Sequence, residues 1–135
     1  HVAEAGLLLS LSVAEVEQDR IGSASLLAER FNARVVLKGP GSVLRLTGHS
    51  EICTHGNQGM ASAGMGDVLA GIAGGVLAGA IRSAASQALL DARFSAGVAL
   101  HSAAADRAAA WVGRRSLIAT DVILALPETI MGSER

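Results

Sequence analysis

A glycine-rich loop that runs directly into an apolar helical pattern is the segment of this sequence best suited to chemistry. The loop spans residues 56–66, reads GNQGMASAGMG, and is followed by Asp67. Glycines permit backbone conformations in which neighbouring amides point inward together. The helix that follows adds its unpaired N-terminal N–H groups and the positive end of its dipole. Such a junction can bind a phosphate or the charge that develops on one during transfer. We therefore predict an anion hole made by Ala63, Gly64, Met65 and Gly66.

The aspartate at the mouth of this predicted anion hole, Asp67, is the candidate catalytic residue. A carboxylate beside a bound phosphate repels it, so we expect Asp67 to accept a proton from a substrate hydroxyl. The alternative interpretation is structural, because an acidic residue in the first turn also stabilises a helix. Neither the Walker-A spacing nor the dinucleotide glycine fingerprint occurs in the chain, so a P-loop or a Rossmann dinucleotide site is not predicted.

The second chemical signal is Lys38, the only lysine in the chain. It ends the apolar run Val35–Leu37 and precedes a turn made of Gly39, Pro40, Gly41 and Ser42. A compact ammonium at this point can pair with a nucleotide phosphate, while the glycines let backbone amides approach it. The alternative is a solvated strand terminus without a ligand.

The elements that position these residues follow the order of an α/β layered structure. Ser12 and Glu15 have the spacing of a capping box, and apolar residues then recur with a helical period as far as Asn32 or Ala33. We expect residues 34–38 to form a buried parallel strand and residues 43–47 and 51–54 to form a hairpin. Residues 55–67 are then a loop.

Three helices are expected after that loop: 67–79, 86–111, and one from Thr120 or Asp121 that stops at Pro127. The order helix, strand, hairpin, glycine loop and consecutive helices is typical of the second half of an α/β fold. No repeat or linker is visible, so we assign residues 1–135 to one domain.

Composition limits the function classes that remain. With 50% hydrophobic residues, 17% charged residues and a formal net charge of −1, the 135-residue chain is neither a disordered tail nor a polyanion-binding module. Aromatic residues make up only 2%, which excludes nucleic-acid binding by base stacking and leaves an aliphatic core. The histidines lack metal-ligand spacing, so no metal site is predicted.

Neither a membrane segment nor a secretory signal is expected. The longest apolar stretch, residues 68–81, contains four glycines and is shorter than the roughly 20 residues of a bilayer span, so we expect a buried core helix. Cys53 is the only cysteine, which excludes an intrachain disulfide and favours a reducing, cytoplasmic compartment.

Several motifs together resemble the ADP-dependent NAD(P)H-hydrate dehydratases of the ribokinase-like superfamily. Residues 56–71 resemble the family signature G-N-x-G-M-A-T-A/G-G-S/T-G-D-V-L-x-G, and residues 35–42 resemble V-V-L-K-G-x-x-T. Residues 119–127 are similar to the closing A-x-D-x-I…L-P, and His1–Glu4 to H-P-G-E. The motifs occur in the family's order across the whole chain.

The resemblance implies a repair reaction on the hydrated, damaged form of NADH or NADPH. A ring hydroxyl is phosphorylated with ADP or ATP, with Mg²⁺ expected, and phosphate is then lost. By position, Lys38 to Ser42 and Gly66 would contact the nucleotide, Asp67 would lie on the substrate hydroxyl, and His1 would line the substrate site. The resemblance also favours a homo-oligomer and allows a hydrate epimerase domain upstream.

Three departures from the family pattern bear on these expectations. Val2 and Ala3 replace proline and glycine near His1, so the local turn can differ. Met65 stands where serine or threonine is usual, which removes a hydroxyl near the phosphates. The family's domain is about twice as long, and all 135 residues match its C-terminal half, so we expect this piece alone to be inactive.

Two other functions stay open from the sequence. The first is a small-molecule kinase of the same superfamily, acting on a sugar or a hydroxymethyl heterocycle and using the same anion hole and Asp67. The second is an inactive nucleotide-binding fragment. A dehydratase would restore NADH from its hydrate, a kinase would consume nucleotide in the presence of an alcohol substrate, and an inactive fragment would do neither.

Overall fold

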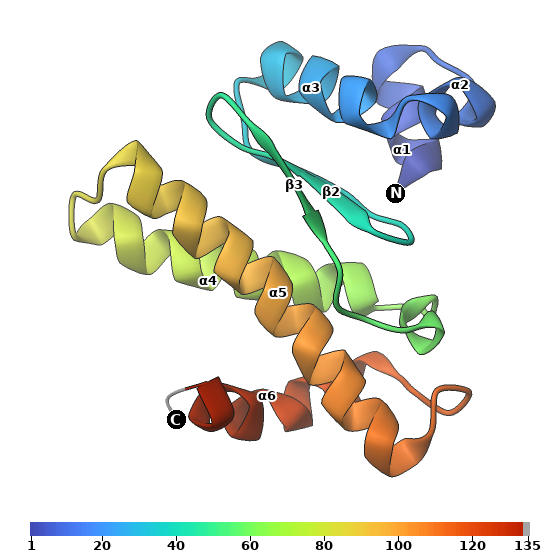
Figure 1. Cartoon of the computed structure of the whole chain (residues 1–135), viewed down its shortest axis with the longest axis vertical. Helices are drawn as coiled ribbons and strands as arrows, with labels where there is room; N and C mark the ends of the chain where they lie inside the picture. The colour runs from blue at the N-terminus through green and yellow to red at the C-terminus, as the bar shows by residue number, and fades with distance from the viewer. Residues whose placement is uncertain (134–135) are drawn as a thin grey trace. The chain divides into compact units, whose positions relative to one another are not determined.

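The computed structural model describes residues 1–133 and divides the chain into two compact units, His1–Thr54 and His55–Arg135. The first unit contains three helices and a three-stranded sheet, and the second contains a short 3₁₀ helix and three long helices (Figure 1). This α/β order agrees with the predicted sequence of helix, strand, hairpin, glycine loop and consecutive helices.

The first unit begins with helices α1 (Val2–Leu9), α2 (Val13–Gln18) and α3 (Arg20–Phe31). The capping box predicted at Ser12 is confirmed: its hydroxyl accepts from the Glu15 amide at 3.2 Å, and the Glu15 carboxylate accepts from the Ser12 amide at 2.8 Å. The single long helix predicted from this start is wrong. Asp19 leaves the helical conformation, and its carboxylate accepts from the Gly22 amide at 2.7 Å, which begins α3 as a separate helix.

The sheet of the first unit consists of β1 (Val35–Leu37), β2 (Ser42–Arg45) and β3 (Ser50–Cys53) in that order. The predicted β2–β3 hairpin is confirmed. The prediction of a parallel strand at 34–38 is not confirmed. Within the described residues, β1 pairs only with β2, and the pair is antiparallel. A fully apolar run indicates burial, but it does not determine the direction of the neighbouring strand. The core under this sheet is aliphatic and comprises Ala5, Val16, Ala24, Leu27, Leu37 and Val43.

The second unit contains η1 (Gln58–Met60), α4 (Met65–Arg82), α5 (Gln87–Val112) and α6 (Ala119–Ser133). The predicted loop and all three predicted helices are present, with α4 beginning two residues before the expected start at Asp67. The prediction that the last helix stops at Pro127 is wrong. Proline removes one helical hydrogen bond, but Val122 and Ala125 are completely buried in the preceding turn. Packing therefore holds α6 together through the proline.

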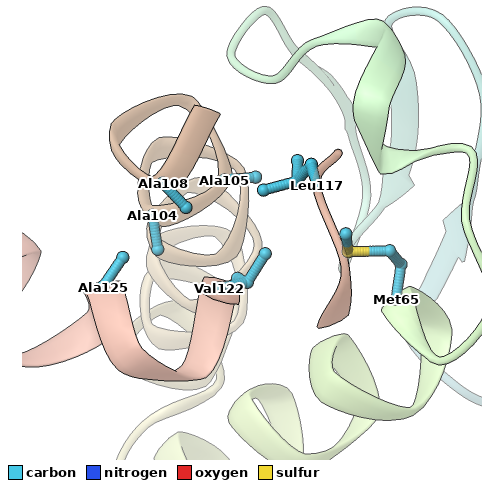
Figure 2. Close-up of a cluster of buried hydrophobic side chains, with 7 residues drawn as sticks. All are labelled: Met65, Ala104, Ala105, Ala108, Leu117, Val122 and Ala125. Carbon is cyan, nitrogen blue, oxygen red and sulfur yellow. The ribbon is translucent and has the colours of Figure 1, made fainter. Parts of the chain in front are cut away.

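The core of the second unit joins α5, α6 and the start of α4 (Figure 2). Its members are small or aliphatic except for one methionine: Met65, Ala104, Ala105, Ala108, Leu117, Val122 and Ala125. The three alanines of α5 are completely buried, so their small size lets the neighbouring segments approach this helix closely. The aliphatic core expected from the composition is confirmed in both units.

Helix α4 differs from the expectation of a buried core helix. Only 17% of its 18 residues is buried, and the positions of Gly71, Gly74, Gly75 and Gly79 face open space. By length and composition alone this helix could cross a membrane, which is weak evidence for a span. Its close contact is with α5, where a Cβ on Gly97 would lie 3.1 Å from Val76. Among the described residues, these four glycines therefore do not mark a close contact with a neighbouring element.

Candidate functional site

The glycine loop ends at a helix start without a side-chain cap. Gly64 is the N-cap of α4 and adopts φ 83° and ψ −13°, a left-handed conformation that favours glycine. The first amide with a helical partner is that of Val68, which donates to the Gly64 carbonyl at 3.1 Å. The amides of Met65, Gly66 and Asp67 therefore precede the helical hydrogen bonds and are available to an anion.

The side chain of Met65 is turned away from this amide cluster. It is 5% exposed and lies in the core with Leu117 and the alanines of α5 (Figure 2). Only the backbone of Met65 can therefore contribute to an anion hole.

Asp67 lies in the first turn of α4 with an exposed side chain. Among the described residues, no hydrogen bond or ion pair is recorded for its carboxylate, so the group is open to a ligand. Its position beside the amides of Met65 and Gly66 places a proton acceptor next to a row of donors. That pair of features is what a hydroxyl-to-phosphate transfer requires.

A clamp between the loop and α5 was not foreseen from the sequence. The Asp106 carboxylate accepts from the Gly56 amide at 2.8 Å and from Asn57 Nδ2 at 2.8 Å. Asn57 Nδ2 also donates to the Ala105 carbonyl at 3.2 Å, and its Oδ1 accepts from the Gly59 amide at 3.0 Å. These contacts fix the start of the glycine loop on a long helix. The sequence signal that could have indicated this clamp is the acidic Asp106 inside the alanine-rich stretch 103–110.

Gly59 packs too tightly for any side chain, which gives a first prediction. A Cβ there would lie 2.3 Å from the Arg114 carbonyl oxygen and 3.0 Å from the Leu117 Cβ. We expect Gly59→Ala to lower the free energy of unfolding by about 1–3 kcal/mol, because backbone must move to admit the methyl group.

The matched control is Gly71→Ala on α4, where a Cβ would meet nothing within 4 Å. Helix propensity should make that change neutral or stabilising by about 0.5–1 kcal/mol. Chemical denaturation of the 135-residue chain measures both. Equal effects of the two substitutions would contradict the tight fit at Gly59.

The lysine turn is held in place by an arginine that the sequence did not single out. Arg20, the first residue of α3, donates to the Pro40 carbonyl at 2.7 Å and to the Leu37 carbonyl at 3.2 Å. A Cβ on Gly39 would lie 2.7 Å from the Arg20 Nη2, so a side chain there would displace this guanidinium. Arg20 therefore sets the backbone on both sides of Lys38.

The remaining features of the turn also fit a phosphate-binding segment. Gly41 has φ 62°, and the Ser42 hydroxyl accepts from the Gly39 amide at 3.3 Å and donates to the Gly39 carbonyl at 3.2 Å. Lys38 is half-buried, and Gly39, Pro40 and Gly41 are exposed. The ammonium and the exposed turn backbone thus lie together in the first unit.

His1 forms the start of α1. Its Nδ1 accepts from the Ala3 amide at 3.1 Å, and Glu4 completes a capping box with the His1 backbone. His1 and Glu4, the two residues that match the H-P-G-E pattern, thus cap the helix that contains Val2 and Ala3.

The predicted site residues thus form two groups, one in each unit. His1 and Lys38–Ser42 lie in the first unit, and Ala63–Asp67 lie in the second. Within the described part of the chain, no group of three or more histidine, cysteine, aspartate or glutamate side chains could hold a metal ion.

Comparisons with known proteins agree on one family. The Carb_kinase family profile, described as NAD(P)H-hydrate dehydratase, matches residues 1–128. A bifunctional NAD(P)H-hydrate repair enzyme Nnr from Coxiella burnetii is 44% identical over 123 residues, covering 90% of this chain and 24% of that protein. An ADP-dependent (S)-NAD(P)H-hydrate dehydratase from Neisseria meningitidis is 42% identical over 108 residues, covering 78% of this chain and 34% of that protein.

A solved structure matches the fold. The ADP/ATP-dependent NAD(P)H-hydrate dehydratase from Bacillus subtilis, co-crystallised with ATP/Mg²⁺, superposes with a TM-score of 0.81 at 23% identity. The match covers 98% of this chain and 46% of the other. The chain therefore spans about half of that structure and about a quarter of the bifunctional relatives.

Proposed function

This chain belongs to the NAD(P)H-hydrate dehydratase family, and from that premise we propose that it supplies the nucleotide site and the catalytic aspartate of a nucleotide-dependent NAD(P)H-hydrate dehydratase. The observation that supports this most directly is the pairing of uncapped helix amides at Met65 and Gly66 with the exposed Asp67 carboxylate. The fold likeness to a dehydratase of known structure adds to it.

In the proposed reaction, Asp67 accepts the proton of the ring hydroxyl of hydrated NADH or NADPH. The hydroxyl oxygen then attacks the terminal phosphorus of ADP, and the bond to the departing AMP oxygen breaks. The free amides of Met65 and Gly66, together with the preceding Ala63 and Gly64 of the predicted anion hole, would stabilise the negative charge on the transferred group. Loss of phosphate together with a ring proton restores the reduced nicotinamide, so the nucleotide supplies the leaving group for dehydration.

The first unit would bind the nucleotide and border the substrate. Lys38 would pair with a phosphate, and the turn from Gly39 through Ser42 would offer its exposed backbone to the rest of the nucleotide. His1 would line the substrate site from the start of α1. ATP in place of ADP would serve the same chemistry.

Mg²⁺ fits the described residues only if it binds mainly through the nucleotide. Mg²⁺ usually keeps several waters and binds through one or two carboxylates together with substrate phosphates. The described residues offer no cluster of ligands, whereas Asp67 provides one exposed carboxylate. Mg²⁺ would therefore be held mainly by the nucleotide phosphates, where it neutralises their charge.

The complete activity would require the other half of the domain. We propose that residues 1–135 form the C-terminal half of one dehydratase domain, as the 46% coverage of the solved relative suggests. The remaining half would cover the exposed apolar face of α4, which is only 17% buried in this chain. The 135-residue chain alone should lack turnover and self-associate through such surfaces.

The relatives suggest the domain organisation of the full protein. Since the Coxiella relative is bifunctional, an upstream hydrate epimerase domain is part of this proposal. We further propose that the full protein is a cytoplasmic homo-oligomer without nucleic-acid or membrane partners.

The experiment that tests the function is recovery of the reduced-nicotinamide absorbance band from hydrated NADH and NADPH. The complete domain containing these residues is incubated with ADP, with ATP and without nucleotide. We expect recovery only with nucleotide. A folded domain that consumes ATP with a sugar or pyrimidine alcohol, and restores no reduced cofactor, would make the superfamily kinase the better assignment.

A further inference from the structure

A cleft of about 280 Å³ lies beside the glycine loop, within the second unit. One wall comes from the loop, and the other comes from the turn between α5 and α6. The lining residues are Gln58, Gly59, Ala61, Ser62, Arg114, Arg115 and Leu117. None of these residues has a role in the proposed transfer, which uses the amides and the carboxylate that follow in the chain.

The cleft is positively charged. Arg114 and Arg115 are its only charged lining residues, and both are exposed. Within the part of the chain that the structure describes, no ion pair is recorded for either guanidinium. Arg107, near the end of α5, instead pairs with Glu128 at 3.2 Å. Two adjacent arginines without an acidic neighbour in the cleft indicate a preference for anions.

The walls of the cleft are fixed to each other. Gly59 lies so close to the Arg114 carbonyl that no side chain fits between them. The Ser62 hydroxyl donates to the Leu117 carbonyl at 3.3 Å, and Leu117 is 3% exposed in the core. The backbone bearing the two arginines is therefore held against the loop that leads to Asp67.

We propose that this cleft is a second anion site, which takes a phosphate group of one of the nucleotides in the reaction. The inference rests on the proposed function, because that function supplies phosphate-bearing ligands on the same loop. Arginine presents a planar fork of donors that matches phosphate oxygens, and the side-chain amide of Gln58 adds a neutral donor. The phosphate can come from ADP, from the pyrophosphate shared by NADH and NADPH, or from the extra phosphate of NADPH.

The test is equilibrium calorimetry with ADP, NADH and NADPH, titrated into the complete domain and into the double variant R114Q/R115Q. These stable ligands report binding whether or not the domain turns over hydrate. The matched control is R93Q, which removes an exposed arginine of α5 that lies roughly 30 Å along the helix axis from the end of α5 next to the cleft. Both variants should keep the wild-type melting temperature, because all three side chains are exposed.

We expect at least one ligand to lose tenfold or more in affinity in R114Q/R115Q and to stay within about twofold of wild type in R93Q. Loss for NADPH alone assigns the cleft to its extra phosphate, equal loss for NADH and NADPH assigns it to their pyrophosphate, and loss for ADP assigns it to the phosphoryl donor. Unchanged affinity for all three ligands, or equal loss in R93Q, overturns the proposal. The absorbance assay on wild type judges the dehydratase function separately.

Discussion

Replacing Asp67 with asparagine in the complete domain is expected to lower kcat by about a thousandfold, within the range seen for removal of a general base. Asparagine keeps the size of the side chain but cannot accept the hydroxyl proton. Asp67 is exposed in the first turn of α4, so the fold should tolerate the change. KM should change far less than kcat, because the amides of the anion hole are backbone groups.

The control must separate this role from helix stabilisation. Asp121 also lies in the first turn of a helix, α6, where its carboxylate accepts from the Ile118 amide at 2.9 Å; Asp121→Asn removes the first-turn charge and keeps an oxygen that can accept this bond. We expect that variant to keep most of the activity, with the absorbance assay and thermal unfolding measured side by side. If both variants lost activity equally, or if Asp67→Asn kept more than a tenth of wild-type kcat, Asp67 would be a helix-stabilising residue and not the base.

Much of the fold could be predicted because local signals and tertiary structure agree. The Ser12 capping box, the αL residue Asn32 at the end of α3 and the hairpin after the lysine turn all lie where the pattern puts them. In each case, nearby residues alone satisfy the free backbone groups of the element.

The errors arise where distant residues decide the outcome. Pro127 is a strong stop signal, yet buried Val122 and Ala125 keep α6 helical through it. The strand direction of β1 depends on its partner, which an apolar run does not encode. Likewise, the glycines of α4 suggest close packing, but their contacts depend on what covers the helix.

The residues of the candidate site likewise divide into those that the sequence reveals and those that depend on distant contacts. Lys38, Gly66 and Asp67 are visible in the sequence because their types and spacing suit phosphate chemistry. Arg20 and Asp106 are not, because each acts on a segment far along the chain: Arg20 on the Pro40 carbonyl and Asp106 on the Gly56 amide. One sequence cannot pair residues that are 20 or 50 positions apart.

The Asp106 clamp leads to the second large expected effect. Asp106→Ala removes the acceptor for the Gly56 amide and one of the two acceptors for Asn57 Nδ2, so the start of the glycine loop keeps only the hydrogen bond from Asn57 Nδ2 to the Ala105 carbonyl of α5. We expect kcat to fall about a hundredfold, the loss associated with displacing reacting groups by about 1 Å. Asp106→Asn retains one carbonyl oxygen as an acceptor, and its kcat should lie between those of the alanine variant and wild type.

Arg107→Ala is the matched control for this clamp, because it removes the neighbouring side chain on α5, whose recorded partner is Glu128 and not the loop. It should keep wild-type kcat, while all three variants are compared in the absorbance assay and in chemical denaturation. A positioning role predicts that kcat falls even where the fraction folded is unchanged, and that asparagine restores part of it. If the loss in Asp106→Ala only followed the unfolded fraction, the clamp would support the fold without ordering the loop, and the link from Asp106 to Asp67 would be wrong. The two hydrogen bonds, both 2.8 Å long and made to the segment that leads to the anion hole, favour the positioning role.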